Sequence, residues 1–451
     1  MSQLEKMKLS EVASIVSGYA FKSGDFTDEG VPVIKIGNIR NGSVEVESNN
    51  TQFLPKQLAD ATNKKFQVRR GDILISLTGS HMTQPNSVVG RVGQYRYPFV
   101  SMLNQRAGKV VASDARRIDN QYLYYLLSTK SARMGIAMLA HGAANQANVS
   151  PKDIPKLQFY IEQDVNTQKK IAAILFTYDQ LLETNERRIA VLEKLAKEIY
   201  TEWFVRMRFH GHQSHEMIRS DIGRIPRSWD VGTIGDLCVS INDGDWIETK
   251  DQGGDDFRLL QVSNIGDGGF RETGNFRFIS QDTFDRLRCQ EVVEGDLLIS
   301  RMPDPIGRAW RVTPMPWRMI TAVDVAIAKP NLDVSAPGFL HYYLNSEWHI
   351  GMAETNSTGT TRPRISRKAL CKIPLFIPPV KLQRDFESIV GPIYSLSVKL
   401  KTMNDNLRRS RDLLLDRLIS GSLSVSDLQI VHPSATPIRQ DKMVSEELVH
   451  A

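Results

Sequence analysis

The chain of 451 residues carries one pattern twice, and this duplication limits its fold more than any single motif does. Residues 33–39 (VIKIGNI) are echoed by residues 259–265 (LLQVSNI), at an offset of about 226 residues. Residues 70–76 (RGDILIS) recur as residues 294–300 (EGDLLIS), at an offset of about 224. An order that is kept while the offset shrinks indicates a duplicated unit that has lost loop residues in its second copy.

Three later matches extend the repeat. Residues 122–126 (YLYYL) match 339–344 (FLHYYL), residues 148–152 (NVSPK) align with 364–368 (RISRK), and Gln168 aligns with Gln383. Short β-rich runs bounded by Gly, Asn, Asp and Pro predict strands in both copies, at residues 31–36, 72–77, 292–300 and 323–328. The sequence therefore predicts one mixed unit that is used twice.

Each copy ends in a long amphipathic helix. Apolar residues recur at three- and four-residue steps over residues 168–203 and again over 386–418. Pro392 is expected to kink the second helix or delay its start. A helix of about 38 residues would be roughly 57 Å long, so its apolar stripe needs a partner helix. We expect an antiparallel coiled coil, because a parallel pair would require residues 209–224 to be almost fully extended.

The predicted fold class is α+β, with two mixed α/β domains separated by the two helices and related by a pseudo-two-fold repeat. The expected order along the chain is a first domain, a central helical spacer, a connector, a second domain, a distal helical spacer and a disordered polar tail. The corresponding ranges are 1–165, 166–208, 209–224, 225–381, 382–421 and 422–451.

Composition narrows the class of protein. With 57 Lys and Arg against 51 Asp and Glu, the formal net charge is +6, which permits contact with nucleic acid without establishing it. Cys238, Cys289 and Cys371 lie far apart and form no C-x-x-C pair, which favours a reducing cytoplasm. The first residues lack a signal-type apolar stretch and no run approaches about 18 apolar residues, so secretion and membrane spanning are disfavoured.

Motifs of catalysis are missing from the sequence. There is no phosphate-binding G-x-x-x-x-G-K-[ST] loop, no G-x-S-x-G elbow, and no second histidine after His215-Glu216. A methyltransferase would need a cofactor-binding βαβ unit and an N-P-P-Y-type turn, and Pro303-Asp304 lacks the acidic-x-Lys continuation of a nuclease. The histidines of residues 210–215 could bind a metal, but a solvated linker explains them better. We expect no catalytic residue, no metal and no cofactor.

Polar and basic residues instead gather at matching places in the two copies. Arg forms paired hydrogen bonds with guanine, Asn and Gln form them with adenine, and Lys, Ser and Thr contact phosphates. These positions are therefore candidate DNA contacts. Each of them could equally be a solvated loop residue, and Tyr19 and Phe21 beside Lys22 could be a packed strand edge. In the first copy the candidates are Lys22, Thr78, Ser80, His81, Gln84, Asn145, Gln146, Asn148 and Lys152. In the second copy they are Arg301, Arg308, Thr360, Thr361, Arg362, Arg364, Arg367 and Lys368.

The ordered motifs over about residues 5–421 resemble the specificity subunit of type I restriction-modification systems. They are residues 8–12 (KLSEV) with 17–21 (SGYAF), 71–76 (GDILIS), 200–204 (YTEWF), 223–229 (GRIPRSW) and 413–421 (LLLDRLISG). The first copy departs from the family at residues 158–164, where a proline-ended apolar strand is usual. The sequence therefore does not fix the residue at which the first long helix begins.

The resemblance implies a subunit without catalytic residues, with two target-recognition domains that read double-stranded DNA. It also implies assembly with two methylation subunits, and further with restriction subunits that carry the ATP-driven motor and nuclease. Two heads on a rigid spacer should then read two half-sites separated by unread base pairs. The alternatives are a coiled-coil adaptor that binds only proteins, which would not retain DNA, and an autonomous DNA-modifying enzyme, which would act as a purified chain.

Overall fold

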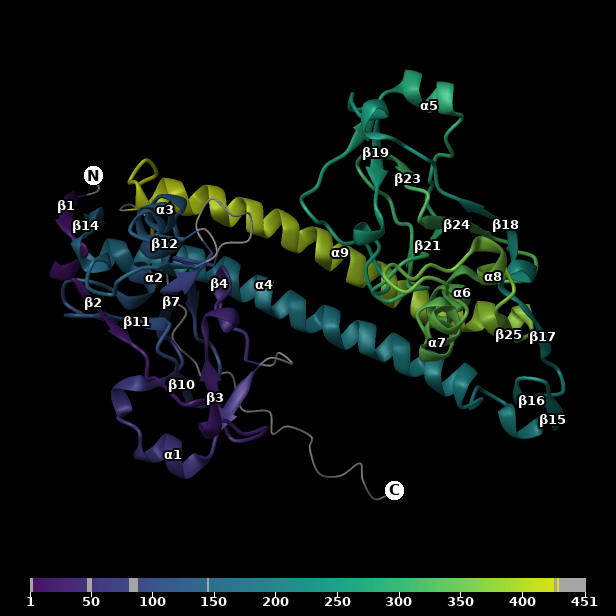
Figure 1. Ribbon diagram of the computed structural model, residues 1–451, viewed down its shortest axis with the longest axis horizontal. Helices are drawn as coiled ribbons and strands as arrows, with labels where there is room; N and C mark the ends of the chain where they lie inside the picture. The colour runs from purple at the N-terminus through teal and green to yellow at the C-terminus, as the bar shows by residue number, and fades with distance from the viewer. Residues whose placement is uncertain (1–2, 47–50, 81–87, 144–145, 426–427, 430–451) are drawn as a thin grey trace. The chain divides into compact units, whose positions relative to one another are not determined.

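The computed structural model describes residues 3–46, 51–80, 88–143, 146–425 and 428–429. The chain forms two compact units of mixed α/β structure, which we call unit 1 and unit 2 (Figure 1). Unit 1 comprises Met1–Glu183 together with Asn404–Ala451, and unit 2 comprises Thr184–Met403. None of the helices within the described ranges is long and apolar enough to cross a membrane.

Unit 1 is built on a five-stranded sheet with the order β2-β11-β7-β9-β4. Its strands are β2 (Ala13–Ser17), β4 (Gly42–Ser43), β7 (Ile73–Ser76), β9 (Val92–Gln94) and β11 (Ala107–Ala112). A second sheet has the order β5-β3-β10-β6. Its strands are β3 (Val31–Ile34), β5 (Gln52–Leu54), β6 (Gln67–Val68) and β10 (Ser101–Leu103).

Smaller elements complete unit 1. The strand β1 (Leu4–Lys8) pairs with β14 (Gln158–Glu162), and β13 (Gln146–Asn148) lies between β8 (Thr78–Gly79) and β12 (His141–Ala143). The short helices are α1 (Lys56–Ala61), α2 (Asn120–Ser128) and α3 (Lys130–Met138). Asp119 begins α2 by accepting a hydrogen bond from the amide of Tyr122, 2.9 Å away.

Unit 2 repeats this plan. Its main sheet has the order β18-β24-β21-β22, which corresponds to β2-β11-β7-β9, and a second sheet has the order β20-β19-β23. The strands are β18 (Cys238–Asp243), β19 (Phe257–Leu260), β20 (Phe278–Ile279), β21 (Leu297–Ser300), β22 (Ala309–Arg311), β23 (Arg318–Thr321) and β24 (Val325–Pro330). In both units one pair of the second sheet is parallel, β3 with β10 and β19 with β23.

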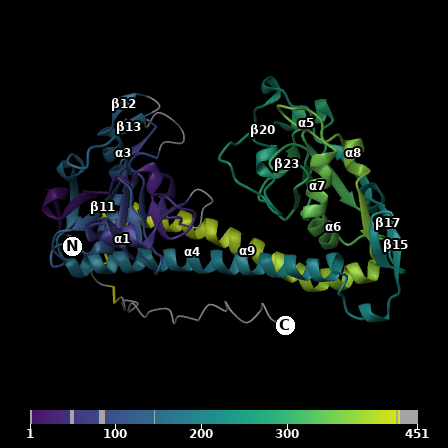
Figure 2. The ribbon, with the colours of Figure 1, turned by 60° about the horizontal axis from the view of Figure 1, so that its bottom comes forward.

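The remaining elements of unit 2 also have counterparts. The strand β17 (Asp230–Thr233) pairs with β25 (Pro374–Ile377) as β1 pairs with β14. The helices α6 and α7 (Figure 2) follow one another in the chain, as α2 and α3 do. The helices are α5 (Gln281–Leu287), α6 (Pro337–Leu344), α7 (Glu347–Thr355) and α8 (Arg367–Cys371). The sequence repeat is therefore a structural repeat.

The two predicted long helices are present. The helix α4 spans Val165–Tyr200 and continues as a π-helical turn, Thr201–Val205, while α9 spans Val380–Ile419. Pro392 lies inside α9, twelve residues after its first residue. The expectation that this proline would delay the start of the helix is therefore wrong. Each long helix is divided between the units, with the first half of α4 and the last part of α9 in unit 1.

The connector differs from the irregular segment that the sequence suggested. Residues 209–224 contain β15 (Met217–Ser220) and the start of β16 (Gly223–Pro226), which pair as an antiparallel hairpin. The hairpin escaped notice because its strands are short and mostly exposed, so they show no apolar alternation. Gly223 has φ +132° at the turn, a conformation that favours glycine.

A buried glutamine joins each long helix to its unit. In unit 1 the Gln168 side chain accepts a hydrogen bond from the Asp119 amide (2.7 Å) and donates to the carbonyls of Arg117 (3.1 Å) and Glu162 (2.7 Å). In unit 2 Gln383 makes the equivalent set, accepting from Ala336 (3.0 Å) and donating to Val334 (3.2 Å) and Pro378 (2.8 Å). The two glutamines that the repeat aligns thus satisfy the same kinds of backbone group.

Candidate nucleic-acid interface

The basic cluster of the second copy lies on a small hairpin of unit 2. Thr358 and Arg364 face each other through two backbone hydrogen bonds of 3.0 and 2.8 Å. Gly359 has φ +101° and permits the turn, which presents Thr360, Thr361 and Arg362 to solvent. Three of the predicted residues therefore lie together at an exposed tip.

Arg301 holds this hairpin against the loop after β21. Its guanidinium donates to the carbonyl of Ile365 (3.0 Å) and pairs with Asp243, while its own carbonyl accepts from the Ile365 amide (3.0 Å). The side chain is only 5% exposed, and burial lowers the pKa of the arginine despite the nearby Asp243 charge. This differs from our expectation of a base-reading loop tip, because the guanidinium is turned inward.

Two further predicted residues support the same hairpin. Arg364 pairs with Asp324 at 2.9 Å, and Arg367, the first residue of α8, lies 3.7 Å from Asp243. Both guanidinium groups keep an exposed part, with 38% and 47% of the side chain accessible, so they can still attract a phosphate. Lys368 follows them and is exposed.

Arg308 also differs from the expectation. It is 2% exposed, and its donors reach the carbonyls of Ile265 (2.6 Å), Pro305 (2.7 Å) and Val262 (3.0 Å). Burial lowers the pKa of this guanidinium. Arg308 therefore fastens two loops of unit 2 together and has no group directed at a ligand.

Unit 1 brings its candidates together at the corresponding place. There β8 pairs with β13, and the Thr78 hydroxyl donates to the Asn148 side chain at 2.8 Å. The Val149 amide donates to the Leu77 carbonyl (2.8 Å), as the Ile365 amide does to Arg301 in unit 2. The repeat thus places a post-strand loop beside a hairpin in both units.

The other predicted residues of unit 1 are distributed around this pair. Ser80 is half-buried, Asn148 and Lys152 are exposed, and Gln146 lies in β13. Lys22 is exposed in a different part of the unit, before a short 3-10 helix, where its amide donates to Asp25. His81, Gln84 and Asn145 lie outside the described residues.

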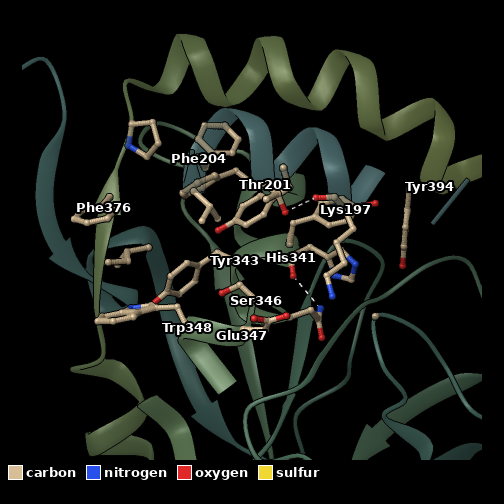
Figure 3. Close-up of a pocket in the computed structure, with 18 of the residues that line it drawn as sticks. Lys197, Thr201, Phe204, His341, Tyr343, Ser346, Glu347, Trp348, Phe376 and Tyr394 are labelled. Atoms are coloured by element: carbon tan, nitrogen blue, oxygen red, sulfur yellow. Dashed lines mark hydrogen bonds between the residues drawn. The ribbon is translucent and has the colours of Figure 1, made fainter. Parts of the chain in front are cut away.

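Unit 2 also contains an aromatic cavity of about 540 Å³ (Figure 3). Its wall includes Tyr200 and Phe204 from the end of α4, Tyr343 from α6, and Trp348 from α7. His341 is 3% exposed at this wall, and burial lowers its pKa to about 3, so the ring is neutral. The lining includes none of the DNA candidates among the described residues, which separates this cavity from the hairpin.

Comparison with known proteins shows which family the chain resembles. The family model described as type I restriction modification DNA specificity domain matches residues 1–194. The type I restriction enzyme MjaIX specificity subunit of Methanocaldococcus jannaschii is 22% identical over 374 residues, covering 80% of this chain and 81% of the relative. The putative MjaX specificity subunit of the same organism is 23% identical over 399 residues, covering 88% of each chain. Residues 1–194 thus match the type I restriction-modification specificity domain, and most of the chain is similar to type I specificity subunits.

The crystal structure of the type I restriction-modification system S subunit from M. genitalium has the same fold. It aligns with this chain at a TM-score of 0.59 and 17% identity, over 92% of this chain and 96% of that one.

The acidic partners of the arginines are the residues that sequence reasoning missed. Asp243 ends β18 and faces Arg301 and Arg367, and Asp324 faces Arg364. The first copy has Ser17 at the position that corresponds to Asp243, so the repeat gave no signal for it. The two carboxylates reduce the positive charge at the base of the hairpin and leave Arg362 at its tip.

Proposed function

We propose that this chain is the DNA-reading component of a type I restriction-modification complex, with each unit reading one half of a bipartite target. The observation that carries the proposal is the repeated pairing of a post-strand loop with a polar hairpin, one pair in each unit. The two loop–hairpin pairs carry different side chains, with Thr78 and Asn148 in unit 1 and Arg362 in unit 2, so they would read different bases.

We assign the DNA contacts mainly to the candidate residues whose side chains are exposed. In unit 2, Thr360, Thr361, Arg362 and Lys368 would contact DNA, while Arg364 and Arg367 would reach phosphates. In unit 1, the residues proposed to contact DNA are Ser80, Asn148 and Lys152, together with His81, Gln84, Asn145 and Gln146. Thr78 would position Asn148, and Lys22 would add a phosphate contact.

We further propose that α4 and α9 form an antiparallel coiled coil that sets the distance between the half-sites. In unit 2, Asn185 lies 3.5 Å from the Met403 sulfur, and Tyr200 packs against Phe386 with ring centroids 6.1 Å apart. As the residue number rises along α4, the residue number of the contacting residue in α9 falls, which is the order expected of an antiparallel pair. In unit 1, Asp179 binds Arg411 at 2.9 Å.

The domain assignment follows. Two target-recognition domains, residues 1–165 and 225–381, would be joined by the helical spacers 166–208 and 382–421, with 209–224 as the connector. The tail from residue 422 lies almost entirely outside the described residues.

The partners proposed are two methylation subunits and, with them, restriction subunits. The chain itself would be non-catalytic, with adenine methylation and ATP-dependent cleavage supplied by those partners. Exposed apolar side chains on both long helices offer docking positions for the methylation subunits. They are Leu181, Val191 and Leu195 on α4, and Ile389, Leu396, Met403 and Leu413 on α9.

Lengthening both helices is expected to widen the gap of the target and leave the half-sites unchanged. Seven residues inserted after Glu183 and seven after Met403 keep the coiled-coil register and add roughly 10 Å, or about three base pairs. Both insertions fall where the chain passes from one unit to the other. Methylome sequencing of a host that carries the variant measures the motif.

The control for this experiment is the same host with the gene deleted and then complemented with the unaltered gene. Deletion should remove methylation of one bipartite motif, and complementation should restore it. Altered bases with an unchanged gap would contradict the spacer role. An unchanged methylome after deletion would contradict DNA reading altogether.

Arg362→Ala is expected to weaken binding about 10- to 100-fold through the half-site that unit 2 reads, because one charged base contact is lost. The matched control is Arg227→Ala, which removes an exposed arginine of unit 2 that is paired with Glu216, away from the hairpin. Binding of the assembled methylation complex to duplexes with single-base changes in either half measures the effect. Equal losses at both halves would argue against this assignment.

A further inference from the structure

Trp246 is an exposed aromatic residue of unit 2, three positions after the Asp243 that pairs with Arg301 and Arg367. Its side chain is 70% exposed, which is unusual for so large an apolar surface. We propose that Trp246 contacts DNA, packing its ring against base edges or a base step of the half-site that unit 2 reads. This inference rests on the DNA-reading function proposed above and adds a specificity-determining residue to it.

The neighbours of Trp246 hold its side chain outward. The Asp245 carboxylate accepts a hydrogen bond from the Gln290 amide at 3.1 Å, and the Asp245 amide donates to the Thr321 carbonyl at 2.7 Å. Ile247 on the other side packs against the core around Phe257. In an extended segment successive side chains alternate, so two inward neighbours direct Trp246 to solvent. The ring is exposed on a fixed backbone.

The Trp246 segment and the hairpin share their supports. Asp243, three residues before Trp246 and so within roughly 10 Å along the chain, pairs with Arg301 and Arg367. The Gly244 amide donates to the Val325 carbonyl (2.9 Å), one residue from Asp324, which binds Arg364. The Trp246 segment is therefore held by the same residues that support the base of the hairpin.

Unit 1 has no such aromatic residue at the equivalent position. Gly18 and Gly244 occupy the same place in the repeat, since a Cβ on either would lie 2.2 or 2.3 Å from a backbone oxygen of the neighbouring strand segment, at Asn104 or Ala322. Each glycine is followed by a parallel bridge to that residue. The counterpart of Trp246 is therefore Ala20, so the contact belongs to one half-site only.

The chemistry of an exposed indole favours DNA as the occupant here. Apolar side chains contact the thymine methyl group in the major groove or wedge between base steps, and both contacts bury the ring. Arg367, which lies 3.7 Å from Asp243, and the exposed Lys368 next to it supply positive charge that draws the phosphate backbone to this part of unit 2.

The test uses the full chain assembled with its methylation subunits, and duplexes that carry the motif found by methylome sequencing. Trp246→Ala is expected to weaken binding about tenfold when the unit 2 half-site is intact, and less than twofold when that half-site is scrambled. Trp246→Phe, which keeps an aromatic ring, should recover most of the loss. Trp348→Ala, which removes another half-exposed tryptophan of unit 2, is the control and should bind as the unaltered protein does.

Three outcomes overturn the inference. Trp246→Ala could match Trp348→Ala on every duplex, could weaken both half-sites equally, or could leave DNA affinity intact while weakening assembly with the methylation subunits. The last would make the residue a protein contact. If the unaltered complex shows no preference for the motif at all, the DNA-reading function itself fails, which is a separate result.

Discussion

Gln383→Ala is expected to destabilise unit 2 by about 3–5 kcal/mol, although it removes only one polar side chain. The glutamine is fully buried and satisfies one backbone amide and two carbonyls, at Ala336, Val334 and Pro378. Each buried group left without a partner costs about 1–3 kcal/mol, and the vacated space adds to the loss. Three groups lose their partner together, so the sum is large for one substitution.

Gln168→Ala should cost unit 1 a similar amount, because its contacts to Asp119, Arg117 and Glu162 are of the same kind. Hydrogen exchange read by mass spectrometry localises each effect. Protection should fall around residues 334–340 in one variant and around 117–123 in the other. Gln180→Ala, at an exposed position of α4, is the control and should change stability by less than about 0.5 kcal/mol. Equal behaviour of Gln383→Ala and this control would disprove the role.

The paired glutamines also show what the sequence could predict. The repeat aligned Gln168 with Gln383 before any contact was known, and the structure confirms that their hydrogen bonds match. The long helices were predictable because an apolar period over dozens of residues depends only on local spacing. Strands were also predictable from local patterns, since β7 and β21 lie inside the predicted strand segments 72–77 and 292–300.

The inward arginines could not be predicted in this way. Arg301 and Arg308 have the residue type of a DNA contact, but their donors are taken by carbonyls far along the chain. Arg301 binds Ile365, 64 residues away, and Arg308 binds Ile265, 43 residues away. Whether a guanidinium faces a ligand or a carbonyl is decided by such long-range neighbours, which a local pattern does not contain. The hairpin tip of unit 2, by contrast, has the predicted exposure.

Asp179→Ala is the second substitution with a large expected effect, about 3–5 kcal/mol on unit 1. This carboxylate is 3% exposed and accepts hydrogen bonds from Arg96 (2.8 Å), Tyr125 (2.9 Å) and Arg411 (2.9 Å). Burial alone would lower the pKa of Arg411, but the charges and hydrogen bonds of Asp179 and Asp412 together outweigh burial and raise that pKa. Removing the carboxylate leaves two partly buried guanidinium groups with only the more exposed Glu183 and Asp412 as partners, which costs far more than losing an exposed pair.

Asp412→Ala is the matched control, because Asp412 pairs with the same Arg411 but is 56% exposed, so its loss should cost less than about 1 kcal/mol. Urea unfolding compares the two, with hydrogen exchange at residues 404–419 reporting release of the last part of α9. If α9 sets the gap as proposed, Asp179→Ala should also broaden the range of gaps that the complex methylates, and Asp412→Ala should not. Identical unfolding curves for the two variants would show that the buried carboxylate does not fasten α9 to unit 1.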